Sequence, residues 1–236
     1  MRNALKISWI LSTIWIGMPF HIHGQGIVRQ LKNVRAQFER LDRYQITARY
    51  RWFPDQEDSG NYSDETQTII HQDGRTLNSF GDTKVLHTPK ATILVDDASE
   101  RMILQPPSDE SPMPWDSQIL DSALTSRLMG EERDGDLVSF ELDMSQANSK
   151  YRSIKMVVDT RLDRLVKVIY LFGSPVLDED TGISAIPRFE VEFTYGGPPG
   201  QAIADRLKIS HYCIQTGETW VPTRQFSSYR LYTSLK

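Results

Sequence analysis

Apolar and polar side chains alternate with a period of two along most of the chain. The alternation is clear at residues 44–52 and 189–195, and it is typical of a β-strand with one buried and one solvated face. Similar short runs follow one another between residues 65 and 104, and turn residues such as Asp73 and Gly74 separate them. Spacing this regular predicts a meander, in which strands that are neighbours in sequence are neighbours in the sheet.

A β-hairpin at residues 91–104 lies in the middle of this pattern. Two apolar runs, 91–95 and 101–104, flank the polar residues 96–100, as expected for a hairpin whose tip is in water. The alternation predicts the later strands at residues 138–144, 154–158, 165–172, 189–195, 207–214 and 219–232.

Two stretches have the three-to-four spacing of an amphipathic helix. The first stripe consists of Ile27, Leu31, Val34, Phe38 and Leu41. The second consists of Ile119, Leu120, Ala123, Leu124 and Leu128, with Asp116 as the expected N-cap and Gly130 as the residue that ends the helix.

The elements together predict a mainly β (α+β) protein of about eleven strands and two helices. Two helices of about 15 and 13 residues are too short to cover the concave side of so wide a sheet. Either the sheet closes on itself or it leaves an apolar cavity. We expect an open antiparallel β half-barrel whose helices cover the concave face.

The first 26 residues have the order of segments that is typical of a secretory signal peptide. Arg2 and Lys6 precede an uncharged run at residues 7–20, and small residues follow at 24–26. We expect cleavage after Gly26 and a single domain at residues 27–236; the alternative is a retained membrane anchor. No cysteine near the leader offers a lipidation site, so the expected product is a soluble periplasmic protein.

Charge and cysteine content restrict the classes of partner. The net charge is −4, and loss of Arg2 and Lys6 with the leader makes it about −6. An acidic chain without a basic stripe is a poor binder of nucleic acid. Cys213 is the single cysteine, so it forms no disulfide within the chain, and we expect a buried apolar role for it.

Three patches resemble the LolA/LolB family of lipoprotein carriers, whose fold is an open antiparallel barrel capped by helices. They are the helix that runs into a strand at residues 27–53, the hairpin with ILVDD and RMIL at 93–104, and YRSIKMVVDTRLDRLVKVIYLF at 151–172. The chain departs from the family at Asp97-Ala98, where the family has Asp-Gly, and at Met102, where an aromatic residue is usual. The resemblance implies an arginine that holds the helical lid, and Arg75 is the nearest candidate for this lid contact.

Catalytic and metal-binding motifs are scarce. The chain has no phosphate-binding glycine loop, no G-x-S-x-G motif and no H-E-x-x-H motif. His71 and His87 could meet across a sheet, but separate strand residues are the favoured interpretation. The acidic residues at 96–100 and 178–180 lack the ligand spacing of a calcium loop, and solvated turns are favoured. We therefore expect no cofactor, no metal and no enzymatic activity; a hydrolase is the least favoured alternative.

The sequence does supply many bulky side chains that are expected to point inward, where a dry core is the simplest role for each one. As a set, they suggest an apolar cavity for acyl chains. The expected cavity residues are Leu31, Phe38, Tyr50, Trp52, Ile93, Val95, Met102, Leu104, Leu124, Leu128, Phe140, Met156, Phe189 and Phe193.

These residues suggest a monomeric periplasmic carrier or chaperone that moves lipids or lipoprotein acyl chains between membrane donor and acceptor proteins. The alternative is a non-enzymatic envelope binding or assembly module with a filled core and no lipid cargo.

Overall fold

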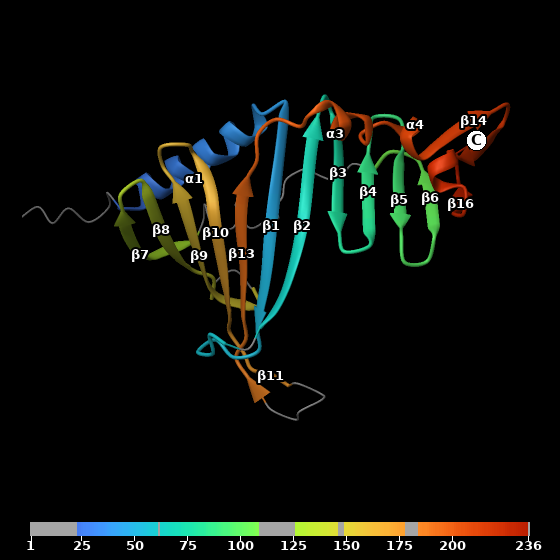
Figure 1. Cartoon of the computed structure of the whole chain (residues 1–236). Helices are drawn as coiled ribbons and strands as arrows, with labels where there is room; N and C mark the ends of the chain where they lie inside the picture. The colour runs from blue at the N-terminus through green and yellow to red at the C-terminus, as the bar shows by residue number, and fades with distance from the viewer. Residues whose placement is uncertain (1–22, 61, 109–125, 146–148, 178–183, 236) are drawn as a thin grey trace, which may run out of the picture.

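The computed structural model describes residues 23–60, 62–108, 126–145, 149–177 and 184–235 (Figure 1). Residues 1–22 of the expected leader, residues 116–125 of the expected second helix and the acidic residues 178–180 lie outside these ranges. No helix of the described ranges is long and apolar enough to span a membrane.

Twelve strands form one sheet with the order β16-β6-β5-β4-β3-β2-β1-β13-β10-β9-β8-β7. The strands are β1 (Arg43–Phe53), β2 (Ser63–Gln72), β3 (Arg75–Phe80), β4 (Thr83–His87), β5 (Thr92–Asp96), β6 (Arg101–Gln105), β7 (Arg127–Asp134), β8 (Leu137–Asp143), β9 (Tyr151–Asp159), β10 (Arg164–Phe172), β13 (Arg188–Tyr195) and β16 (Arg230–Thr233). The strands β7 and β16 are the two edges, so the sheet is open, and this confirms the predicted mainly β half-barrel.

The predicted meander is confirmed for β1 to β6, where each strand pairs with the next in antiparallel orientation. At the β2–β3 turn, Asp73 and Gly74 have φ angles of 51° and 71°, as a two-residue hairpin turn requires. The sheet is mixed, because β16 pairs with β6 in parallel orientation.

Two small two-stranded sheets and short helices complete the described chain. They are β11 (Val176–Leu177) with β12 (Ser184–Ala185), β14 (Cys213–Thr216) with β15 (Thr219–Pro222), the helices α3 (Gln201–Asp205) and α4 (Ile209–Tyr212), and the 3-10 helix η1 (Arg224–Phe226). We call residues 201–235 the C-terminal segment.

The helix α1 (His23–Glu39) packs on the sheet through the predicted stripe. Leu31 and Val34 are 2% and 1% exposed, and the side chain of Gln30 donates a hydrogen bond to Asp163 in the β9–β10 turn at 2.8 Å. The helix begins at His23, before the expected first residue Ile27, so it includes the site of the predicted cleavage.

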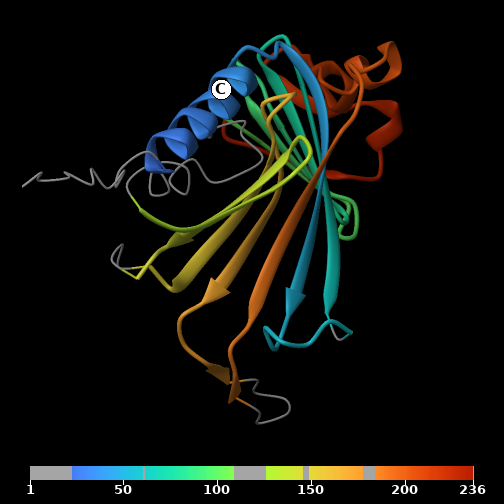
Figure 2. The same cartoon turned by 90° about the vertical axis from the view of Figure 1, so that its left-hand side faces the viewer.

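The sheet has a hydrophobic core on each of its two faces. The helix core lies between α1 and one face of β1, β2, β8, β9, β10 and β13. The C-terminal core lies between the C-terminal segment and the opposite face of β2 to β6. Figure 2 shows α1 in blue and the C-terminal segment in orange and red on opposite sides of the sheet.

The predicted end of the second helix is wrong. Leu128 and Gly130 lie on the strand β7, which pairs with β8, and a register shift separates the two residues. Leu128 is therefore not part of a helix, because the backbone groups of residues 127–134 form hydrogen bonds with β8.

Two predicted strands near the C-terminus are also wrong in part. Residues 207–212 are not a strand: α4 occupies Ile209–Tyr212, and only Cys213 and Ile214 belong to β14. The predicted strand at 219–232 is divided into β15, η1 and β16. Pro222 ends β15, since proline has no backbone N–H to continue a ladder.

Candidate functional site: an aromatic belt on the α1 face

Aromatic rings from five strands lie on the sheet face that α1 covers, at the end of β1 away from the helix. Tyr44 at the start of β1 contacts Phe38 of α1 at a ring distance of 4.7 Å. Tyr50 lies six residues further along the strand, about 20 Å away at the usual rise. The rings, which we call the aromatic belt, are Phe80 on β3, Tyr50 and Trp52 on β1, Phe189 on β13, Tyr170 and Phe172 on β10, and Tyr151 on β9.

The rings of the belt contact one another in sequence across the strands. Tyr50 lies between Phe80, at a centroid distance of 6.3 Å, and Phe189, at 5.9 Å. Trp52 meets Phe172 edge-on at 5.3 Å. These distances are those of attractive aromatic pairs, so the belt is one continuous apolar surface.

On this face, the solvent exposure of the side chains increases from the end near α1 toward the aromatic belt. Ala48 and Phe193, which pair with each other nearer α1, are 0% and 6% exposed. The belt rings of Tyr50, Trp52 and Phe189 are only half-buried, and Phe80 is 43% exposed. The belt therefore offers more ring surface to a ligand than Ala48 and Phe193 do nearer the helix.

Few polar groups accompany the belt. The Tyr50 hydroxyl donates a hydrogen bond to the side-chain oxygen of Gln67, and burial raises the pKa of this hydroxyl. At the other end, the Lys150 ammonium lies 5.1 Å from the Tyr151 ring centre and 5.7 Å from that of Phe172. One cation is thus placed beside an apolar surface.

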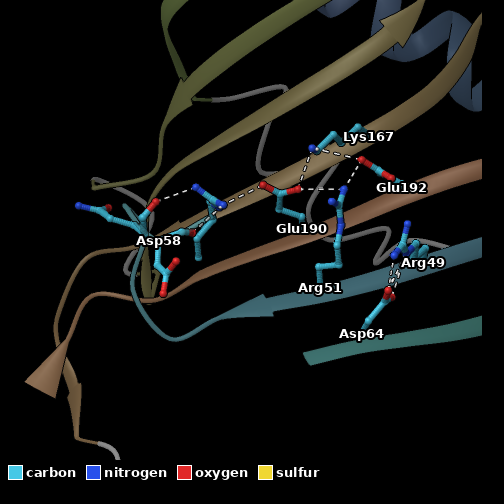
Figure 3. Close-up of polar contacts among 9 residues, drawn as sticks. Arg49, Arg51, Asp58, Asp64, Lys167, Glu190 and Glu192 are labelled. Atoms are coloured by element: carbon cyan, nitrogen blue, oxygen red, sulfur yellow. Dashed lines mark hydrogen bonds and ion pairs between the residues drawn. The ribbon is translucent and has the colours of Figure 1, made fainter. Parts of the chain in front are cut away.

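Charged side chains on the other face hold the same strands together (Figure 3). Glu190 is 6% exposed and forms ion pairs with Lys167 at 2.7 Å, Arg188 at 3.0 Å and Arg51 at 3.2 Å. Arg51 also pairs with Glu192. Because successive strand residues face opposite sides, β1 and β13 supply the belt on one face and this charge cluster on the other.

The structure brings only part of the predicted cavity set together. Leu31, Phe38, Phe140, Met156 and Phe193 belong to the helix core, with Tyr50, Leu128 and Phe189 packed against it; Trp52 lies in the belt. Ile93, Val95, Met102 and Leu104 belong to the C-terminal core on the opposite face. Leu124 lies outside the described residues.

A small cavity lies between the C-terminal end of α1 and the sheet. It is lined by Val34, Phe38, Leu41 and Tyr195 among others, and it has a volume of about 10 Å³. This cavity holds no more than a water molecule, so it has no room for an acyl chain.

Four belt residues were missing from the predicted set: Phe80, Tyr151, Tyr170 and Phe172. Tyr170 and Phe172 follow the buried Val168 at every second position of β10, so they face the same side of the sheet. This alternation was the signal in the sequence that could have identified them. Their contact with the belt depends on the pairing of β10 with β13, which the local pattern does not give. Arg75, the predicted lid contact, lies at the β2–β3 hairpin and lines a pocket on the side of the C-terminal segment.

The candidate metal ligands have other contacts. His71 Nδ1 lies 2.8 Å from the Thr76 hydroxyl, and its ring stacks on Tyr44. The Asp96 carboxylate accepts hydrogen bonds within the hairpin turn, and Asp97 pairs with Lys84. Within the described ranges, no three His, Cys, Asp or Glu residues gather as a metal site would require.

No protein-family model matches the chain, and no curated protein matches it in sequence. Among solved structures, a conserved protein from Thermus thermophilus matches with 15% identity and a TM-score of 0.40, over 78% of this chain and 93% of its own. A LolA superfamily protein from Nitrosomonas europaea matches with 10% identity and a TM-score of 0.28, over 76% and 96%. The lipoprotein LppX from Mycobacterium tuberculosis matches with 10% identity and a TM-score of 0.34, over 75% and 98%.

At these identities the likeness concerns the fold, and a fold alone does not fix a function.

Proposed function

We propose that the protein is a non-enzymatic periplasmic carrier that binds acyl chains of lipids or lipoproteins on the aromatic belt. The observation that supports this proposal is the gradient of exposure along one sheet face. The described side chains nearest α1, such as Ala48 and Phe193, are buried, and from Tyr50 and Trp52 onward the contacting rings are half-buried.

The belt suits an acyl chain for two physical reasons. Each methylene removed from water contributes roughly 0.8 kcal/mol, and the contacting rings from five strands provide a long apolar surface. The ion pairs of Glu190 on the opposite face join β1, β10 and β13. The aromatic belt on these strands is therefore ordered before a ligand binds. Lys150 is placed to pair with an anionic head group.

A binding module with a filled interior and no lipid cargo is the second candidate. The cavity of about 10 Å³ beneath α1 favours it, because that part of the interior has no room for a chain. Such a module would act on a protein partner through its open sheet edges, β7 or β16.

Tryptophan fluorescence distinguishes the two candidates. Residues 27–236 contain Trp52, Trp115 and Trp220, and Trp52 belongs to the belt. In a Trp115→Phe/Trp220→Phe variant, a bromine-labelled stearate is expected to quench Trp52 in a saturable way, and unlabelled stearate is expected to reverse the quenching. Absence of quenching in a folded sample would favour the module.

Two substitutions of exposed residues locate the binding surface. Phe80→Ser removes a belt ring that is 43% exposed, and it is expected to weaken stearate binding. Leu177→Ser changes a side chain that is 60% exposed on β11, outside the belt, and it is the matched control. Equal affinity in the two variants would contradict binding on the belt.

A further inference from the structure

A second cavity lies on the other side of the sheet. It has a volume of about 540 Å³ and opens between the β2–β3 and β4–β5 turns and the C-terminal segment. The size is within the range of pockets that bind small ligands. The helix core and the aromatic belt contribute no side chain to it.

The C-terminal segment supplies the apolar part of the cavity wall, beside the polar side chains of Ser210 and Gln215. Ile209 and Trp220 are half-buried side chains that pack against the C-terminal core, and the buried Cys213 also lines the cavity. The cavity therefore has an indole ring and aliphatic surface in reach of a ligand. Its Cys213 thiol is neutral, since burial raises the pKa to about 11.

Cations line the cavity from both sides. Arg75 and Lys90 come from the turns and Lys208 from the C-terminal segment, together with one acid, Asp73. Asp73 already pairs with Arg43 at 3.5 Å and accepts a hydrogen bond from Gln72, and Lys208 pairs with Asp205 at 2.7 Å.

Arg75 and Lys90 are left without an ion pair to any residue of the described ranges. The Lys90 turn is ordered by Thr88, whose hydroxyl accepts hydrogen bonds from the Lys90 and Ala91 backbone N–H groups at 3.2 and 3.0 Å. Arg75 follows directly on the Asp73-Gly74 hairpin turn. Two cations that have no ion pair within the described ranges thus lie on short turns at the rim of the cavity.

We infer that this cavity is a binding site for an amphipathic anion, a molecule with a single carboxylate or phosphate group and a short acyl or aryl chain. The anionic group lies between Arg75 and Lys90, and the apolar part packs against Trp220 and Ile209. A guanidinium and an ammonium are the donors that carboxylates and phosphates prefer. The site does not depend on acyl binding at the belt, because the two surfaces lie on opposite faces of the sheet.

Trp220 reports on this site when it is the only tryptophan of residues 27–236. In a Trp52→Phe/Trp115→Phe variant, decanoate is expected to shift the Trp220 emission in a saturable way, and decanol is expected to bind about tenfold more weakly, because it lacks the charge-assisted hydrogen bonds. Equal affinity for decanoate and decanol, or no response of Trp220 to decanoate, would overturn the inference.

The cations are tested in the same background. Arg75→Gln/Lys90→Gln is expected to weaken decanoate binding at least tenfold and to leave decanol binding unchanged. The control Arg29→Gln/Lys32→Gln removes the same charge from exposed positions on α1. If the control loses as much affinity as the test variant, the effect is one of net charge and the inference fails.

Two phosphate ligands identify the source of the anion. Decyl phosphate competing with decanoate supports the shared anionic chemistry, and the tighter of the two ligands indicates the head group. Inorganic phosphate is expected to compete at least tenfold more weakly than decyl phosphate, since the apolar wall contributes to binding. Equal competition by inorganic phosphate and decyl phosphate would contradict the inference that the ligand is amphipathic. If decyl phosphate changes the emission of Trp220 in its single-tryptophan variant and leaves that of Trp52 unchanged in the other, the ligand binds at this cavity and not at the belt.

Discussion

Ile69 and Ile70 are neighbours in the chain and lie in different hydrophobic cores. Ile69 is 2% exposed in the helix core, and Ile70 is 3% exposed in the C-terminal core. One strand, β2, therefore carries a buried surface on each face. The protein is built from two covers on opposite sides of one open sheet, and each cover protects a different part of its width.

We expect Ile69→Ala and Ile70→Ala each to lower the free energy of unfolding by roughly 2–5 kcal/mol, since both remove packed methylenes and leave a cavity. Thr68→Ala, at a half-buried neighbouring position, is expected to cost less than either. Urea denaturation followed by circular dichroism measures all three. A loss near zero for Ile69→Ala would contradict a filled helix core.

The strands were the most predictable part of the fold. Residues 44–52 alternate because one face of β1 is covered, and the structure gives them the predicted faces. The α1 stripe was equally clear, since Ile27, Leu31, Val34 and Phe38 are all buried as predicted. Both patterns depend on local geometry alone.

The division between the two faces was not predicted. Ile93 and Met102 alternate in the same way as Phe140 and Met156, so the pattern predicts one shared cavity for all four. The register through β1 and β2 places the first pair on the opposite side. The adjacent residues Ile69 and Ile70 were a local sign that both faces of the sheet are covered.

The sequence of the C-terminal segment predicts strands because its apolar residues are frequent. Leu207, Tyr212 and Cys213 are all buried in the C-terminal core, a spacing that fits neither strand alternation nor a long helix. Tertiary packing decided the local conformation here, as it often does for short apolar runs.

The buried carboxylate of Glu190 is expected to contribute strongly to stability. Glu190→Gln leaves Arg51, Lys167 and Arg188 without the charge that they surround, and breaking a buried pair in this way costs roughly 3–5 kcal/mol. Glu192→Gln changes a side chain that is 38% exposed and is expected to cost much less. Urea denaturation of the two variants under identical conditions measures the difference, and equal losses would contradict a special role for the buried position.

Stability is expected to fall in mildly acidic solution because of His71. Burial lowers its pKa below the ordinary value of 6.5, against the weaker opposite effect of Asp42 and Asp73. As the pH falls below about 6.5, the unfolded chain binds a proton that the folded chain does not, so the free energy of unfolding decreases down to the folded pKa.

His71→Gln is expected to reduce the pH dependence of the urea midpoint between pH 7 and 5, and His211→Gln is expected to do the same, since burial also lowers the His211 pKa. An unchanged slope in His71→Gln would show that the ring is accessible to protons in the folded state.

The Cys213 thiol is expected to be unreactive in the folded protein. It is 1% exposed, and burial raises its pKa from 9.0 to about 11. The reactive thiolate is therefore about a hundredfold rarer at pH 8 than in the unfolded chain. Labelling with a disulfide reagent at pH 8, with and without urea, measures the two rates. A native rate close to the unfolded one would mean that the contacts of Cys213 with the C-terminal core open readily, and with them the wall that carries Trp220.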